Sequence, residues 1–378
     1  MMYDVIVIGA GPCGSVAAKE TACHNLKTLL IDKKKHIGRP VHCTGLLSKK
    51  TVETLKISQN SLLNEIKGAY IHFPNGKRIT IATKEIKAYV VDREALDKEL
   101  LSEAKKIGVD VKLETEAVNI SQNTIEVEHK SKKSQLKADV FIGAYGSRYS
   151  SNNTLTAFPP PKKILYGLQT IARYTPIDRN FVELFFGSTY SDCFFAWAVP
   201  MNEKDAKVGL ACSKAVLAKQ GFQNLLERLK CNCHENPIVG IIPIGPPKIT
   251  AKGNMLICGD AAGQAKPTSG GGIYTGTLCA KIAAETTVRH LNGKGLLKEY
   301  ERNWRKEIGK EFKIGMFAHE ILTRLTDTQM DRMFPVFANT NNLNLIKEVG
   351  NIDYPSLLIR KFFSSSANYN TNSSDERK

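Results

Sequence analysis

A glycine-rich turn near the start of the chain constrains the fold more than any other feature of this sequence. The segment YDVIVI (3–8) is an apolar, β-branched run, and GAGPCG (9–14) follows it directly. The next segment, SVAAKETACHN (15–25), has the small-residue pattern of a helix, and KTLLIDK (27–33) has the composition of a second buried strand. Strand, turn, helix and strand in this order predict a βαβ unit within a parallel sheet.

The turn has the pattern G-x-G-x-x-G, in which each glycine has its own role. Gly9 permits the tight turn, Gly11 allows the backbone to approach a pyrophosphate, and Gly14 allows helix and strand to pack closely. The helix that starts near Pro12 and Cys13 adds unpaired N–H groups and the positive end of its dipole. The turn therefore predicts binding of a dinucleotide through its phosphates.

An acidic residue at the end of the second strand supports the same prediction. Asp32 stands at the spacing of roughly 20 residues at which the dinucleotide motif places a carboxylate that accepts hydrogen bonds from a ribose. Lys33 lies next to it and is included among the predicted cofactor-binding residues. The alternative is a glycine-rich turn that binds no ligand.

A second glycine-rich segment, GDAAGQAKPTSGGGIYTG (259–276), follows the apolar run NMLICGD (254–260) late in the chain. Asp260 closes that run as Asp32 closes the second strand, and it can hydrogen-bond a ribityl or ribose hydroxyl. The other predicted cofactor contacts in this segment are Gly259, Gly270, Gly271, Gly272 and Ile273. A ligand contacted from both ends of the chain must be long, so FAD fits better than NAD, because the flavin ring needs a contact surface of its own. The alternative is that these glycines only permit close packing.

The order of the segments predicts an α/β protein. Its Rossmann-type FAD-binding domain is split in sequence by an inserted antiparallel β-sheet substrate domain, and a C-terminal helical region follows. We expect the FAD-binding domain at 1–50, 84–155 and 250–290, the antiparallel sheet at 51–83 and 156–249, the helical region at 291–363, and a disordered polar tail at 364–378.

Local patterns support this division. The segment 70–82 predicts a hairpin around its Pro-Asn-Gly turn, and 92–108 predicts a helix that ends at a glycine. Strands dominate from 164 to 245, at the turn spacing of an antiparallel sheet. The segment 312–325 predicts a helix with one apolar face, formed by Ile314, Phe317, Ile321, Leu322 and Leu325.

Length and composition exclude several classes of protein. The chain has 378 residues, of which 42% are hydrophobic, enough for two or three globular domains. It has no apolar run of about 18 residues and no basic leader, so we expect neither a spanning helix nor a signal peptide, and we expect a cytoplasmic location. The nine cysteines are scattered, and CNCH (231–234) lacks a second ligand pair, so we expect reduced thiols and no metal site.

The charge favours an anionic partner. There are 53 basic and 37 acidic residues, for a net charge of +16, which suits phosphate groups or an anionic membrane surface. Peripheral attachment to the inner face of the cell membrane fits this charge. No recognisable nucleic-acid-binding module is present, so we expect no nucleic acid partner, although a non-catalytic or RNA-binding flavoprotein stays open on charge alone. A solvated, lysine-rich surface without any partner is the plainest alternative.

Five segments also form a set that resembles a known family. They are GAGPCGSVAA (9–18), HCTGLLS (42–48), VVDREALDKEL (90–100), FFAWAVP (194–200) and GDAAGQAKPTSGGGIYTG (259–276). Together they resemble the geranylgeranyl reductase family, flavoproteins of the para-hydroxybenzoate-hydroxylase-like FAD superfamily. The first segment is common to many flavoproteins, whereas the last, combined with CTGL, is much more specific.

The resemblance implies an FAD-dependent reductase that saturates C=C double bonds of geranylgeranyl chains, and in the archaeal branch the substrates are digeranylgeranylglycerol phospholipids. By position, Arg93 would meet the FAD phosphates, Asp260 would lie beside the pyrophosphate and ribityl chain, and the backbone of residues 270–273 would flank the isoalloxazine. Cys43 and Val118 complete the predicted cofactor-binding set.

The resemblance places residues 43–46 on the substrate side of the flavin. The predicted substrate-binding residues are Gly45, Leu46, Phe195, Trp197 and Pro267. Alkene reduction also needs a proton donor near the flavin, for which the candidates are Cys43, which position favours, His42 and Tyr274. The plainer alternatives are an inert buried thiol, a surface or phosphate-facing histidine and a wall of the substrate tunnel.

Some positions depart from the family pattern. Tyr145 stands where the family commonly has an aspartate, which leaves direct use of a nicotinamide open. His42 replaces a frequent arginine, and Phe195 replaces a common tyrosine. A flavin monooxygenase or halogenase of the same superfamily is the alternative function, and the electron donor stays open among ferredoxin, a deazaflavin and NAD(P)H.

Overall fold

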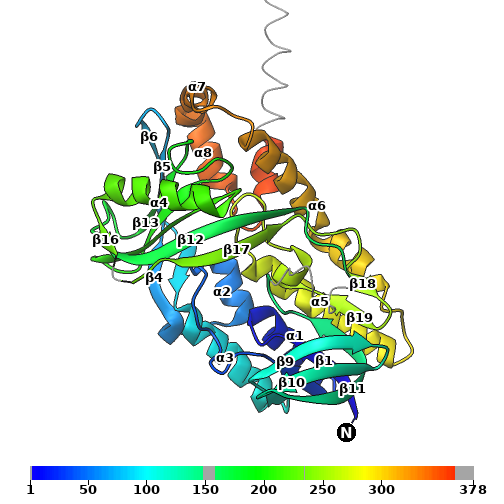
Figure 1. Ribbon diagram of the computed structural model, residues 1–378. Coiled ribbons are helices and arrows are strands. Elements are labelled where there is room, and N and C mark those ends of the chain that lie inside the picture. Colours follow the sequence, from blue (N-terminus) through cyan, green and yellow to red (C-terminus); the bar gives the residue numbers. More distant parts are fainter. Residues whose placement is uncertain (1, 148–157, 234, 362–378) are drawn as a thin grey trace, which may run out of the picture.

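The predicted βαβ unit organises one of two large sheets in the computed structural model, which describes residues 2–147, 158–233 and 235–361 (Figure 1). Strands β1 and β2 run parallel, with Val5 opposite Thr28, and the helix α1 connects them. The eight strands of this first sheet are β1 Met2–Ile8, β2 Thr28–Ile31, β8 Asp110–Lys112, β9 Thr115–Ser121, β10 Thr124–His129, β11 Lys132–Gly143, β18 Ala251–Lys252 and β19 Met255–Ile257.

The first sheet joins segments from both ends of the chain. Its order is β18-β19-β11-β1-β2-β8, and β10 pairs with both β11 and β9. Side chains of β1 alternate between two cores, because successive residues of a strand point to opposite faces. Val5 and Val7 pack beneath the helices, whereas Ile6 and Ile8 pack on the face that carries the β9–β10 hairpin.

The second large sheet is mainly antiparallel, in agreement with the predicted fold class. Its order is β16-β12-β15-β14-β13-β5-β6, with β17 also paired to β12, and β5 and β13 form its parallel pair. The strands are β5 Gly68–His72, β6 Arg78–Ala82, β12 Lys163–Arg173, β13 Phe181–Phe185, β14 Ala196–Pro200, β15 Asp205–Cys212, β16 Asn232–Cys233 and β17 Ile238–Ile244. A three-stranded sheet of β3 Leu46–Ser48, β4 Leu62–Ile66 and β7 Ala88–Val91 completes the β structure of the described chain.

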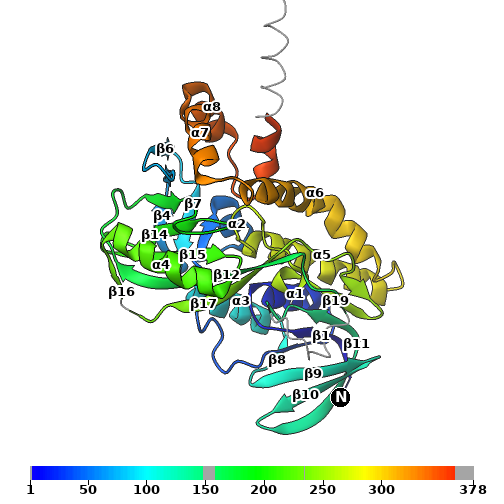
Figure 2. The same cartoon turned by 45° about the horizontal axis from the view of Figure 1, so that its top comes forward.

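Helices pack around these sheets, and a further helical segment lies at residues 355–361, at the end of the described chain. The numbered helices are α1 Pro12–Cys23, α2 Lys49–Leu55, α3 Arg93–Lys106, α4 Ala215–Leu229, α5 Ile273–Leu291, α6 Glu299–Leu322, α7 Asp327–Ala338 and α8 Thr340–Val349. Two short 3-10 helices lie at Gln59–Ser61 and Gly259–Ala262. Figure 2 shows α7 and α8 at one end of the molecule and the β9–β10 hairpin at the opposite end.

Strands dominate the stretch 164–245, as predicted, and this stretch also contains α4, which packs Phe222 and Leu225 onto one face of the second sheet. The prediction for 312–325 was wrong in part, because α6 ends at Leu322 and Leu325 lies beyond it. The apolar face predicted for α6 is not its buried face, because Phe317 is 56% and Ile321 is 40% exposed. The buried side of the last turns is formed by Phe312, Gly315, Met316 and His319.

The predicted polar tail at 364–378 lies outside the described residues. Among the residues that are described, no helix is both long enough and apolar enough to cross a membrane.

Candidate functional site

In the first glycine turn, the backbone packs closely against Gly9 and Gly14 but leaves open space beside Gly11. A Cβ on Gly9, whose φ is +105°, would lie 2.3 Å from the carbonyl oxygen of Ala144, and one on Gly14 would lie 1.7 Å from the carbonyl oxygen of Gly9. By contrast, no atom of the described residues lies within 4 Å of the corresponding point on Gly11. Gly11 therefore borders open space, where a ligand backbone can approach, at the N-cap of α1.

Asp32 is tied to this turn. Its Oδ2 accepts a hydrogen bond of 2.7 Å from the N–H of Ala10, and its Oδ1 accepts one of 2.8 Å from the N–H of Lys34. A carboxylate has about four lone-pair positions, so it can hold the turn and still accept a hydroxyl. Lys33, next to Asp32, is exposed.

The two glycine-rich segments meet at Cys13. A Cβ on Gly259 or on Gly276 would lie 2.7 Å from the sulfur of Cys13. The thiol fills the space between α1 and the second turn, and burial raises its pKa well above the ordinary value. Turns from the two ends of the chain thus lie against each other, which is the arrangement that a long dinucleotide requires.

Asp260 and Arg93 lie beside these turns. A Cβ on Gly272 would lie 2.9 Å from Oδ1 of Asp260. Burial raises the pKa of Asp260 to about 6, and the nearby Arg93 guanidinium opposes that shift. Arg93 is the first residue of α3, a helix capped by the Asp92 carboxylate, and its Nη2 lies 2.9 Å from Oδ1 of Asp97. Arg93 thus brings a buried positive charge to the site.

The loop that precedes β3 brings Cys43 to the same region. Its sulfur accepts a hydrogen bond of 3.3 Å from the N–H of Gly45 and also interacts with the Arg93 guanidinium. A Cβ on Gly45 would lie 3.2 Å from Nζ of Lys207, a lysine of β15 that is only 4% exposed. Cys43 therefore lies near two buried cationic side chains.

Gln169 couples this loop to the second sheet. Its Oε1 accepts a hydrogen bond of 2.6 Å from the hydroxyl of Thr44 and one of 3.3 Å from Nε1 of Trp197. Trp197 is thereby fixed against the loop that carries Cys43. Leu46, the first residue of β3, packs in the small core to which Trp197 also contributes.

An aromatic wall lies against the second glycine turn. Phe194 stacks on Phe195 with ring centroids 4.2 Å apart, and Phe195 meets Trp197 at 6.1 Å. A Cβ on Gly270 would lie 3.3 Å from Cδ1 of Ile242 and 3.6 Å from Cζ of Phe194. The second sheet thus presents an apolar surface to the turn on which the sequence places the flavin ring.

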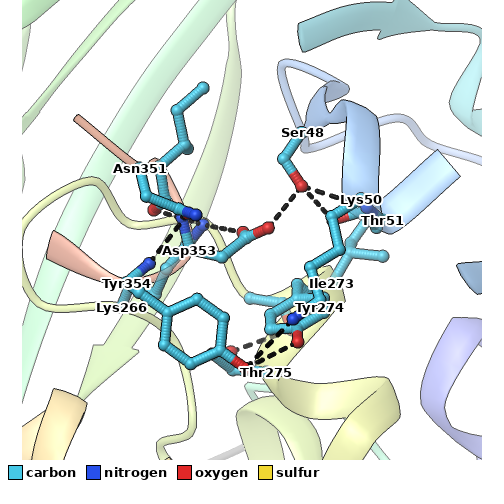
Figure 3. A network of polar contacts seen from close by, with 12 residues as sticks. Ser48, Lys50, Thr51, Lys266, Ile273, Tyr274, Thr275, Asn351, Asp353 and Tyr354 are labelled. Atoms are coloured by element: carbon cyan, nitrogen blue, oxygen red, sulfur yellow. Dashed lines mark hydrogen bonds and ion pairs between the residues drawn. The ribbon is translucent and has the colours of Figure 1, made fainter. Parts of the chain in front are cut away.

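A network of polar contacts fastens the C-terminal segment to the same turn (Figure 3). Nζ of Lys266 lies 2.8 Å from Oδ1 of Asp353, with side chains that are 8% and 1% exposed. It also donates a hydrogen bond of 3.0 Å to the carbonyl oxygen of Ile352. Ser48 at the N-cap of α2 donates to the other oxygen of Asp353. A buried ion pair, completed by further hydrogen bonds, therefore joins three distant segments of the chain.

Tyr274 belongs to this network. Its hydroxyl lies 2.8 Å from that of Tyr354, and Nζ of Lys50 lies 5.2 Å from the centre of its ring. Burial raises the pKa of the Tyr274 hydroxyl to about 12. This tyrosine is thus engaged with the C-terminal segment.

Other predicted residues have different surroundings. Nδ1 of His42 lies 3.0 Å from the carbonyl oxygen of Val239, and burial lowers the pKa of this imidazole. Its described hydrogen bond thus directs it to β17. Pro267 packs on α6, since a Cβ on Gly315 would lie 3.0 Å from its Cδ. Val118 is half-buried in β9.

Tyr145, the residue that departs from the family pattern, has a packing role. A Cβ on Gly143 would lie 2.7 Å from Cε1 of its ring. Burial raises the pKa of its hydroxyl. The ring covers the end of β11 and packs against the core that lies beneath the β9–β10 hairpin.

Comparisons with known proteins agree with this geometry. Residues 4–147 match the family model of FAD dependent oxidoreductases. Over 386 residues the chain is 32% identical to the digeranylgeranylglycerophospholipid reductase of Methanocaldococcus jannaschii, and the match covers 96% of this chain and 97% of that protein. The chain belongs to the digeranylgeranylglycerophospholipid reductase family. It is an FAD-dependent oxidoreductase, as the sequence predicted.

Two further similar proteins match nearly the whole chain. An uncharacterized protein of Methanocaldococcus jannaschii is 28% identical over 372 residues, with 96% of this chain and 95% of that protein covered. A crystal structure of a geranylgeranyl bacteriochlorophyll reductase-like protein from Thermoplasma acidophilum is 25% identical and superposes with a TM-score of 0.83, covering 96% of this chain and 99% of that one. The reductase family and the fold are thus shared over nearly the whole chain.

The sequence did not reveal several residues of the site. Lys207 stands at a position that the sequence pattern of its strand would leave exposed, Gln169 is an ordinary polar residue, and Lys266 and Asp353 are 87 residues apart. Lys266 stands within the glycine-rich segment, so its position was the one available signal. Lys207, Gln169 and Asp353 become part of the site only through contacts with residues that are distant in the sequence.

Proposed function

We propose that this chain uses FAD to saturate C=C double bonds of geranylgeranyl chains, with archaeal-type digeranylgeranylglycerol phospholipids as its substrates. The observation that carries the proposal is the apolar wall of Phe194 and Ile242 against the turn at Gly270. An isoprenoid chain needs such a surface to bind beside a flavin. The names of the relatives that match along the whole chain support the same substrate class.

The described residues provide a cradle that suits FAD. The open backbone at Gly11 suits the pyrophosphate, Asp32 suits the ribose, and Asp260 suits the ribityl hydroxyls. Residues 271–273, where the turn leads into α5, would offer backbone N–H groups to the isoalloxazine, whereas the N–H of Gly270 already donates to the carbonyl oxygen of Lys266. Bound FAD in its reduced form supplies the hydride for the reaction.

The protein supplies the proton and the orientation of the alkene. A trisubstituted alkene resists hydride attack, so protonation of one carbon must accompany or precede hydride transfer to the other. Cys43 is the proposed proton donor, because its thiol lies near the buried cationic side chains of Arg93 and Lys207, which stabilise the thiolate that remains. Trp197 and Phe195 hold the chain and exclude water.

The other two candidates fit the role less well. His42 is directed to β17 by its bond to Val239, and Tyr274 has its hydroxyl engaged by Tyr354. We assign His42 to the rim of the site and Tyr274 to its wall.

The phospholipid headgroup would stay near the surface, where basic side chains attract phosphate. The net charge of +16 and the exposed side chains Phe317 and Ile321 of α6 support peripheral attachment to an anionic bilayer. The same charge suits an acidic ferredoxin as electron donor, with a deazaflavin and NAD(P)H as the other donors to test. Flotation with anionic and with neutral vesicles tests the attachment, and only the anionic vesicles should carry the protein upward.

Lipid analysis in a host that makes geranylgeranylated ether lipids tests the proposal. With a competent electron donor present, the wild-type protein should add mass in steps of two hydrogens, and the Cys43→Ser variant should add far less. Unchanged lipids with active donor and FAD-loaded protein would contradict the reductase. Oxygen-dependent consumption of NAD(P)H with an aromatic substrate would instead favour the monooxygenase or halogenase, an alternative that rests on the shared superfamily fold.

A further inference from the structure

Lys207 is a buried cation. In the mechanism proposed above it only stabilises negative charge near Cys43 and takes no part in proton transfer. It lies in the middle of β15, between Ile171 of β12 and Val199 of β14. Within the described chain its hydrogen-bond acceptor is the carbonyl oxygen of Val91, at 3.4 Å. An ammonium group has three N–H donors, so one long bond leaves it poorly satisfied. Burying a cation in this way costs stability, which indicates that the residue acts in the site.

The surroundings of Lys207 connect it with Cys43. Gly45 is close to both residues. A Cβ on Gly45 would lie 3.2 Å from Nζ of Lys207, and the N–H of Gly45 donates a hydrogen bond to the sulfur of Cys43. The charged or titratable groups that face it are Cys43 from the loop and Arg93 and Asp92 from the start of α3. Gly45 thus lies beside both groups: a side chain there would crowd the amine of Lys207, and its N–H donates to the thiol of Cys43.

Of the two cations near Cys43, only Lys207 can release a proton. Arg93 is committed to Asp97 at 2.9 Å, and a guanidinium does not deprotonate in proteins. Burial lowers the pKa of Lys207 to about 8, Cys43 opposes the shift, Arg93 adds to it, and Asp92 opposes it. The amine can therefore give up a proton near neutral pH and take it back.

We propose that Lys207 restores the proton that Cys43 gives to the substrate. In the first step the S–H bond of Cys43 breaks as a C–H bond forms on the alkene, and the hydride that completes the reduction comes from reduced FAD. In the second step an N–H bond of the Lys207 ammonium breaks as the S–H bond forms again, and the neutral amine takes a proton from water. Cysteine and lysine end each cycle unchanged. This inference rests on the proposed function, and specifically on Cys43 as proton donor.

Two matched variants separate charge from proton transfer. Lys207→Met removes the cation, whereas Lys207→Arg keeps it but cannot release its proton. The FAD content and absorption spectrum of each purified variant report whether the site has formed. If Lys207→Met does not retain FAD, Lys207→Arg carries the test alone.

The first readout needs no substrate. Iodoacetamide is added to the oxidised, FAD-loaded protein at neutral pH, and the peptide that carries Cys43 is followed by mass spectrometry. Loss of a neighbouring cation should slow this alkylation about tenfold in Lys207→Met, because the positive charge that favours attack by the sulfur is gone. Lys207→Arg should stay within about twofold of the wild type. Equal alkylation rates in the wild type and Lys207→Met would overturn the inference.

The second readout is the pH profile of alkene reduction. The wild-type rate should fall as pH rises through about 8, where Lys207 loses its proton. Both variants should be slower and should lack this step, and retention of the step in Lys207→Arg would overturn the inference. A Cys43→Ser variant that reduces lipid at the wild-type rate would refute the proton-donor role and the inference together. Reduction that depends on Cys43 but not on Lys207 would refute the inference alone.

Discussion

Nζ of Lys266 lies 2.8 Å from Oδ1 of Asp353, and this buried ion pair fastens the C-terminal segment to the glycine turn that begins α5. The N–H of Lys266 donates to the carbonyl oxygen of Gly271, and its own carbonyl oxygen accepts from the N–H of Gly270. The lysine is thus part of the turn from which residues 270–273 would meet the flavin. A substitution of Asp353 should therefore disturb this turn, although Asp353 lies 87 residues from Lys266 in the sequence.

Replacement of Asp353 should destabilise the protein strongly. Asp353→Asn leaves the Lys266 ammonium buried without its counter-charge, which typically costs about 3–5 kcal/mol of unfolding free energy. Urea denaturation of the FAD-free protein measures this loss. The double variant Lys266→Met/Asp353→Leu should recover most of it, because two apolar groups need no pairing. A double variant as unstable as Asp353→Asn would show that the ion pair is not the cause.

Gly11 and Gly14 should separate cofactor binding from folding. Alanine fits the backbone at Gly11, where φ is −73° and no described atom crowds the Cβ, so Gly11→Ala should change the unfolding free energy of the FAD-free protein by less than about 1 kcal/mol. The same methyl group would meet the pyrophosphate, so the dissociation constant of FAD should rise at least about tenfold.

Gly14→Ala is the matched control for that experiment. Its Cβ would lie 1.7 Å from the carbonyl oxygen of Gly9, so α1 must move away from β1 and the FAD-free protein should already be destabilised. FAD titration by fluorescence and urea denaturation together give both quantities. Unchanged FAD affinity in Gly11→Ala would contradict the pyrophosphate site.

Asp260 should make the stability of the FAD-free protein depend on pH. Its pKa is raised from 3.8 to about 6 in the folded protein, chiefly by burial. Between these values the unfolded chain ionises while the folded one stays protonated, so the folded state loses stability as pH rises, and the loss is complete above the folded value. Asp260→Asn should therefore be more stable than the wild type at pH 7, by up to about 3 kcal/mol.

The gain in Asp260→Asn should vanish at pH 4, where the carboxyl is protonated in the folded protein. Denaturation curves of both proteins at the two pH values check the sign. A lower stability of Asp260→Asn at pH 7 would contradict a burial penalty at this carboxylate.

His319 should destabilise the protein toward acid. It is 2% exposed on α6, no hydrogen-bond partner of its Nε2 is present among the described residues, and its ring centroid lies 6.2 Å from that of Phe194. Burial lowers its pKa from 6.5 to about 4, with Lys163 adding to the shift and Glu320 opposing it. As pH falls below 6.5 the unfolded chain binds a proton that the folded chain does not, so stability is lost down to about pH 4.

His319→Leu removes the imidazole and with it this loss of stability toward acid. The difference in unfolding free energy between the wild type and His319→Leu should shift by about 2 kcal/mol between pH 7 and pH 5, to the disadvantage of the wild type. A difference that is the same at both pH values would contradict the assignment.

Much of the fold could be predicted because its signals are local. The apolar run before Gly9, the glycine spacing and Asp32 require only neighbouring residues, and the Asp92 cap marks the start of α3. The sequence also predicted that both glycine turns serve one long ligand, whereas their contact through the side chain of Cys13 appears only in the structure.

The remaining features depend on contacts that no local pattern contains. The alternation along β15 would expose Lys207 on one face, but the loop at Gly45 covers that face. The buried side of α6 includes Gly315 and His319, neither of which is a typical apolar core residue. At Gly315 a small residue is favoured, because Pro267 packs closely against it. The helix α4 begins at Ala215, and its N-cap residue Lys214 makes no side-chain cap hydrogen bond, so the sequence lacked the usual signal of a helix start.

A single-turnover experiment shows whether the bound, reduced flavin transfers its hydride to the lipid. The FAD-loaded protein is reduced in the absence of oxygen and mixed with digeranylgeranylglycerol phospholipid, and both the flavin absorption and the lipid mass are followed. The account predicts that the flavin becomes oxidised as the lipid gains two hydrogens for each flavin consumed. A flavin that stays reduced beside unchanged lipid, and that is oxidised only when oxygen enters, would contradict it.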